Sequence, residues 1–318
     1  MQPQIQQILN QNGTKTAKIR AMLALGLTKR QIADLLTNGN YGFVQNVYKK
    51  MQLEGLQISN LTQIIESASI TPAIFNKEFG VEFEAYNVAK SVLKQKLNAV
   101  GIACETEDYN HTTRRHWKIV HDGSLTGNST FELVSPILKG QAGLDEMMKV
   151  CRVLEKCGAK VNKSCGTHVH INGANFTLDQ WKRIYINYAR LEKVIDGFMP
   201  ESRRGNANTY CKGFQQVMNF ETKIKSATNV EEFNRILGNS RYWKVNPQSY
   251  SRHKTCEFRQ HNGTTDFLKI STWVRFLSNL VDFSAQYEIT DKSLNGLKNF
   301  NNAETVDFYK YRTLELAA

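Results

Sequence analysis

Phe79-Gly80-Val81-Glu82-Phe83-Glu84 is the stretch that decides the fold of this 318-residue chain. Its two glutamates stand two positions apart, and successive side chains of a β-strand point to opposite faces of the sheet. Val81 and Phe83 would therefore face a core, while Glu82 and Glu84 would share the other face. We expect a strand over residues 81–86.

Three other segments hold ionisable residues in similar strand patterns. The first contains two histidines. The second contains a glutamate, an arginine and a histidine, which are spaced two residues apart and would share one face. The third contains a single glutamate. These residues are His168 and His170, then Glu257, Arg259 and His261, then Glu132. Any one such face is often merely solvated, but four that converge would hold glutamates that repel one another without cations. Magnesium suits such a site when phosphate oxygens complete its coordination.

Arg259 would supply a fixed cation for a phosphoryl group, so the pattern predicts phosphate chemistry on a metal-lined sheet. The paired histidines leave a second interpretation open, a catalytic zinc site of His168, His170 and Glu132. No HExxH helix accompanies them, and the excess of carboxylates favours a harder metal than zinc.

Helical and strand patterns interleave from Phe79 onward. Further strands are predicted at residues 117–122, 130–134, 160–172 and 254–261, and helices at residues 88–100, 143–157, 178–198 and 268–283. The crossover pattern of a parallel sheet is not clean in this order. We therefore expect an α+β domain in which helices flank a mostly antiparallel sheet.

The first 51 residues follow a different pattern. Apolar residues recur with a helical period, Thr28 and Gln31 form a capping-box start, and a polar turn at residues 37–40 precedes the last helical stretch. Three short helices with a tight turn before the last are typical of a helix-turn-helix. The segment also carries seven basic residues against Asp34 alone, half of the formal net charge of +12.

Such a charge attracts nucleic acid, so we expect DNA as a partner of this segment. The residues predicted to face a groove or phosphates are Lys29, Arg30, Tyr41, Gln45, Asn46, Lys49 and Lys50. A solvated basic face without a partner, or a surface for protein contacts, is the alternative.

Seven segments together resemble a known family. They are residues 79–84, 122–125, 131–138, 165–171, 203–211, 241–246 and 255–264. In this order they resemble the amidoligases, relatives of glutamine synthetase and glutamate–cysteine ligase, over roughly residues 78–285. The predicted helix-turn-helix lies outside the resemblance.

The resemblance implies a glutamine synthetase-like domain that uses ATP and Mg²⁺, with Mn²⁺ as an alternative, to join a carboxylate to an amine through an acyl phosphate. The implied metal ligands are Glu82, Glu84, Glu132, His168 and Glu257. His170 would contact the nucleotide, and Arg259 the transferring phosphoryl group. Asp122 would hold the substrate or a metal-bound water. Arg203 and Arg204 would bind phosphate or a substrate carboxylate.

The predicted organisation is a helix-turn-helix domain at residues 1–51, a linker at 52–76, the catalytic domain at 77–290 and a C-terminal loop and helix at 291–318. No apolar stretch reaches the ~18 residues of a membrane span. The N-terminus lacks the pattern of a signal peptide, and the six cysteines form no CxxC pair. We therefore expect a cytoplasmic protein with reduced thiols and no membrane partner.

The sequence alone is compatible with three functions. The first is an active ligase acting on a peptide, a protein or an amino acid, which agrees with the phage and mobile-element neighbourhoods that the resemblance implies. The second is a DNA-binding protein whose ligase-like domain is an inactive scaffold. The third is a zinc hydrolase that uses the histidine pair. A degenerate ligase would usually lose a metal-ligand or arginine position, and none is lost.

Overall fold

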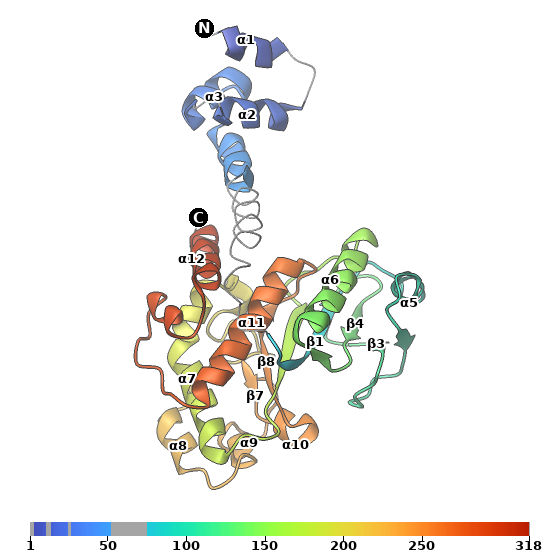
Figure 1. Cartoon of the computed structure of the whole chain (residues 1–318), viewed down its shortest axis with the longest axis vertical. Helices are drawn as coiled ribbons and strands as arrows, with labels where there is room; N and C mark the ends of the chain where they lie inside the picture. The colour runs from blue at the N-terminus through green and yellow to red at the C-terminus, as the bar shows by residue number, and fades with distance from the viewer. Residues whose placement is uncertain (1–2, 11–13, 25–26, 52–74, 318) are drawn as a thin grey trace. The chain divides into compact units, whose positions relative to one another are not determined.

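The computed structural model describes residues 3–10, 14–24, 27–51 and 75–317 (Figure 1). The chain divides into two compact units, Met1–Ala73 and Ile74–Ala318. The finer division at residues 51, 76 and 290 stays a prediction, and most of its linker lies outside the described residues.

The first unit is helical. In its described residues, the helices are α1 (Pro3–Asn10), α2 (Lys15–Ala24), α3 (Lys29–Leu36) and one that includes residues 41–51. The predicted capping box is present, because Gln31 N donates to Thr28 Oγ1 over 3.3 Å and Thr28 N donates to Gln31 Oε1 over 2.9 Å. A small core holds Ile5, Ile19, Met22, Ile32, Ala33, Val44 and Val47. The assignment of these helices as a helix-turn-helix stays a prediction.

The second unit is built on one sheet with the strand order β2-β3-β4-β1-β6-β8-β7, and β5 pairs with β1. The strands are β1 (Glu78–Ala85), β2 (Cys104–Thr106), β3 (Trp117–Val120), β4 (Phe131–Val134), β5 (Leu138–Lys139), β6 (Gly166–Asn172), β7 (Val245–Asn246) and β8 (Thr255–Asn262). Among these strands only β2 and β3 pair in parallel. The predicted α+β class with a mostly antiparallel sheet is therefore confirmed.

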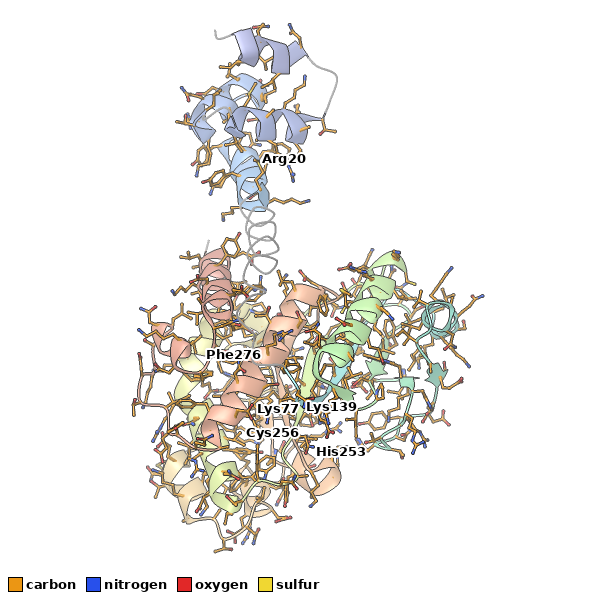
Figure 2. The ribbon with its side chains drawn as sticks, in the orientation of Figure 1. Arg20, Lys77, Lys139, His253, Cys256 and Phe276 are labelled. Atoms are coloured by element: carbon orange, nitrogen blue, oxygen red, sulfur yellow. The ribbon has the colours of Figure 1, made fainter. Side chains whose placement is uncertain are left out.

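Helices cover one face of this sheet. The long ones are α6 (Gly140–Lys156), α7 (Leu178–Gly197) and α11 (Phe267–Ser284), which carries Phe276, labelled in Figure 2. The unit also contains the helices α5 (Lys90–Ala99), α8 (Phe220–Ser226), α9 (Glu232–Ile236), α10 (Ser249–His253) and α12 (Ala303–Ala317). None of the helices in the described residues combines the length and the apolar character needed to cross a lipid bilayer.

The core lies between these helices and the inward side chains of the strands. Val81 and Phe83 of β1 are buried there as predicted. The C-terminal helix α12 joins the same core, since the ring of Tyr309 stacks on Phe198 with centroids 4.1 Å apart. The acidic residues of β1 are thereby left for the other face of the sheet.

Two predicted features of the strands are wrong in detail. The strand expected from residue 160 begins only at Gly166, because residues 162–165 form a turn in which Asn162 Oδ1 accepts from Ser164 N over 2.8 Å. Three further strands, β2, β5 and β7, have three or two residues each and were not expected.

A β-bulge in β8 corrects the expectation for His261. Val169 of β6 pairs with Phe258 and Thr167 pairs with His261, so two residues of β8 stand opposite one residue of β6. The extra residue reverses the alternation of side chains. His261 therefore points to the core, with its ring centroid 5.7 Å from that of Trp273.

Burial lowers the pKa of His261 to about 3. The unfolded chain takes up a proton below the ordinary histidine pKa of about 6.5, so folded stability is present above that pH and is lost as the pH falls toward 3. Relative to a His261→Gln variant, the free energy of unfolding should fall by about 1.4 kcal/mol per pH unit between roughly pH 6 and 4. Urea titrations across this range measure it, and parallel pH profiles would contradict the burial of a neutral ring.

Candidate active site

A cavity of about 600 Å³ opens over the polar face of the sheet. Its lining includes nearly all of the residues predicted for the site. These are Glu82, Glu84, Asp122, Glu132, His168, His170, Arg203, Glu257 and Arg259. Arg204 is not among the lining residues, and its Nε donates to Met199 O over 2.7 Å.

Strand register brings the central residues together. Glu84 of β1 stands opposite Glu132 of β4, and Glu82 stands opposite His168 of β6. On the other side of β6, His170 stands opposite Glu257 of β8. Directly opposed side chains on one sheet face lie about 4.5–5.5 Å apart at Cβ, so the antiparallel pairing itself assembles the cluster.

Glu82 lies between the two histidines. His168 Nδ1 is 2.8 Å from Glu82 Oε2, and His170 Nε2 is 3.3 Å from Glu82 Oε1. Burial favours the neutral carboxyl, but the hydrogen bond with His168 and the nearby His170 ring hold the pKa of Glu82 well below its usual range. Glu82 is therefore a fixed negative charge at the centre of the cavity.

Glu84 and Glu132 form an acidic pair next to Glu82. Gly166 N donates to Glu84 Oε2 over 2.5 Å, and His168 Nε2 is 3.5 Å from Glu84 Oε1. Burial, together with the charges of Glu82 and Glu84, raises the pKa of Glu132 well above its usual range. In the absence of a cation, this carboxyl can relieve the crowding only by holding a proton.

Glu257 is fixed by two donors. Asn246 Nδ2 donates to Glu257 Oε2 over 2.7 Å, and Arg259 Nη1 donates to Glu257 Oε1 over 2.6 Å. Burial opposes ionisation, but the charges of Arg259 and His170 lower the pKa of Glu257. Arg259 also donates from Nε to Tyr210 O over 3.4 Å, which leaves one edge of its guanidinium uncommitted.

Asp122 lies at the edge of the acidic pair. Ser124 N and Ser124 Oγ each donate to Asp122 Oδ1 over 2.7 Å. The predicted loop Asp122–Leu125 thus holds its carboxylate by a short local turn.

Arg203 is buried in the cavity wall beside the start of β6, where Nη2 donates to Cys165 O over 2.5 Å. A Cβ atom on Gly166 would lie 3.1 Å from both terminal nitrogens of Arg203 and from His168 Nε2. Glycine at this position allows the guanidinium, the histidine and the strand to approach one another closely.

The donor atoms form three overlapping groups in which all candidate ligand atoms lie within 4.8 Å of one another. The groups are Glu82, His170 and Glu257; Glu82, Glu132 and His168; and Glu84, Asp122 and Glu132. In the first group, the buried His170 Nε2 lies 3.3 Å from Glu82 Oε1 and 3.8 Å from Glu257 Oε2. A cation at this group would offset the repulsion between the two carboxylates.

The sequence did not indicate Lys118, which also lines the cavity. This buried residue of β3 donates from Nζ to Asn110 O and Thr112 O, each over 2.9 Å. It thereby fixes the loop of residues 110–112, which also lines the cavity. Its position between the buried Trp117 and Ile119 is the period-two signal that could have placed it on the polar face.

Comparison with known proteins gives a family match and a structural similarity. A family model described as "Putative amidoligase enzyme" matches residues 76–281. A solved structure titled "Crystal structure of novel glutamine synthase homolog" is similar with a TM-score of 0.36 and 10% sequence identity, over 82% of this chain and 69% of that chain. No curated protein matches the chain.

Proposed function

The chain belongs to the amidoligase family, and on this premise we propose that it is an ATP-dependent ligase that joins the carboxylate of one substrate to the amine of another. The observation that carries the proposal is the set of three overlapping carboxylate and histidine groups beside Arg259 in one cavity. We propose a glutamine synthetase-like arrangement of substrates for this cavity, with an amino acid, a peptide or a protein as substrate.

The donor set fits Mg²⁺ or Mn²⁺. Each group offers at least two carboxylates and at most one histidine, and oxygen-rich sets of this kind suit hard divalent ions. A catalytic zinc site usually takes two or three nitrogen ligands, but His168 and His170 fall into different groups. Bound at these groups, the metal ions would neutralise the phosphate oxygens of ATP and the crowded glutamates.

Arg259 is the residue we assign to the transferred phosphoryl group. Its hydrogen bond with Glu257 fixes the guanidinium, and the charge of Glu257 raises its pKa against the effect of burial. A positioned, permanently charged guanidinium stabilises negative charge that develops on phosphoryl oxygens in the transition state.

The proposed reaction has two steps. A carboxylate oxygen of the acid attacks the γ-phosphorus of ATP, the bond to the β–γ bridging oxygen breaks, and ADP leaves. The amine nitrogen then attacks the acyl carbon, inorganic phosphate leaves with one oxygen of the acid, and the nitrogen loses a proton. No side chain of the protein becomes covalently attached in either step.

The cavity has two chemically different ends that suit the two substrates. Arg241 and Arg252 join Arg259 in the lining near β7 and β8, whereas Glu132 and Asp122 lie toward β4. We assign the polyphosphate to the first end, where three arginines gather, and the amine to the second, beside the carboxyl groups of Asp122 and Glu132.

The wall over the cavity would protect the acyl phosphate. Residues 109–114 line it, and Arg241 Nη1 donates to Tyr109 Oη over 3.1 Å, which joins this loop to the segment before β7. Excluding water in this way favours attack by the amine over hydrolysis.

Phosphate release from ATP with Mg²⁺, screened over paired acids and amines, tests the proposal. We expect release that requires both substrates and an amide product with the combined mass of the two less one water. Failure of every pair, together with no nucleotide binding in calorimetry, would contradict the ligase. A domain without turnover would then support the alternative of an inactive scaffold.

A further inference from the structure

The helix that includes residues 41–51 has one face in the core of the first unit and one face outside it. Val44 and Val47 are buried in that core. Asn40 caps the helix, since its Oδ1 accepts from Phe43 N over 3.1 Å. By the helical period of 3.6 residues, the outward face is centred on Gly42, Asn46 and Lys49, with Lys50 beside them. We call these four residues the outward face.

The outward face carries the positive charges of Lys49 and Lys50. Among the described residues, no carboxylate pairs with Lys49 or Lys50. Asp34, the one acidic residue in the first 51, lies 3.8 Å from Arg30 and is thus occupied elsewhere. Lys29 makes a cation–π contact within the unit, with Nζ 4.7 Å from the ring centroid of Tyr48.

Gly42 is not required by the fold of this unit. A Cβ atom at this position would meet Asn40 Oδ1 at 3.6 Å, which is an ordinary van der Waals contact, and no other neighbour in the described part of the chain lies within 4 Å. Glycine in a helix is less favourable than alanine by up to about 1 kcal/mol. Its presence on the outward face leaves the backbone open to the close approach of another molecule.

We propose that the outward face enters the major groove of double-stranded DNA. The groove admits an α-helix, asparagine can pair with the edge of adenine, and lysines bind phosphates. Asn46 is exposed in the second turn of the helix, while Lys49 and Lys50 follow about one turn later. Gln45 is left out of this surface, because its side-chain oxygen is buried.

Fluorescence anisotropy of the full chain with a mixed-sequence DNA duplex of about 24 base pairs, roughly two helical turns, tests the proposal. The matched pair of variants is Lys49→Gln with Lys50→Gln, against Lys96→Gln with Lys156→Gln, which removes two exposed lysines of the second unit. The slope of log affinity against log salt should shrink by about 2 in the first variant and stay unchanged in the second.

The variant Gly42→Ala distinguishes a loss of contact with DNA from a loss of folded structure. We expect it to unfold at the wild-type temperature or slightly above it, since alanine favours the helix, and to lose about tenfold in duplex affinity, as for one lost base contact. Three results would each overturn the proposal. They are no duplex binding by the wild type at low salt, equal salt slopes in the two lysine variants, or tighter binding of a single-stranded RNA of the same length.

Discussion

Replacing Arg259 by alanine should lower the turnover number by about 10³- to 10⁵-fold, the range found for arginines that stabilise a transferring phosphoryl group. The reason is geometric as well as electrostatic. Glu257 holds Arg259 Nη1 at 2.6 Å, so the guanidinium is already positioned before substrates bind. Its remaining donors can then meet the phosphoryl oxygens without reorganisation in the transition state.

Steady-state kinetics at saturating ATP measure this effect. Arg115→Ala is the matched control, since Arg115 is exposed and lies outside the cavity lining. Arg259→Lys keeps the positive charge but loses the planar, paired donors of the guanidinium. Its turnover number should therefore lie between those of Arg259→Ala and the wild type. Turnover of Arg259→Ala equal to that of the control would remove Arg259 from the chemistry.

Glu82→Gln should abolish tight Mn²⁺ binding and lower turnover by about 10³-fold or more, because loss of several kcal/mol of charge stabilisation corresponds to that factor. Glu82 belongs to two of the three donor groups. It is also the anion that both histidines contact. Its neutralisation thus affects two candidate ion positions with one nearly isosteric change.

Calorimetric titration with Mn²⁺ tests the metal assignment independently of any substrate. Glu105→Gln is the control, because Glu105 is an exposed strand residue that pairs with Lys94 at 2.6 Å. We expect the control to bind and turn over like the wild type. Wild-type Mn²⁺ affinity in Glu82→Gln would show that the cavity uses its carboxylates for another purpose.

Much of the fold follows from residue periodicity. The alternation around Glu82 and Glu84 places β1, and antiparallel register then opposes these residues to His168 and Glu132. The sequence could not predict the strands β2, β5 and β7, because two or three residues are too few to show the alternation of buried and exposed side chains. Their positions depend on which neighbouring strand offers hydrogen-bonding groups.

The sequence could not predict which way side chains point after an irregularity in a strand. The spacing of Glu257, Arg259 and His261 fits a regular strand, and only the pairing with β6 reveals the bulge that turns His261 into the core. Arg203 and Arg204 are adjacent, so their sequence alone cannot say which one reaches the cavity. Arg203 lies in a 3₁₀ turn and points inward, whereas Arg204 bonds to Met199 O.

The proposal that a carboxylate is activated by phosphorylation meets its most direct test in the fate of the carboxylate oxygens. An acid that supports turnover is labelled with heavy oxygen in its carboxylate, and the inorganic phosphate is analysed by mass spectrometry after amide formation. We expect one heavy oxygen in the phosphate for each amide formed. Phosphate without heavy oxygen, or heavy oxygen in AMP, would contradict the acyl-phosphate mechanism.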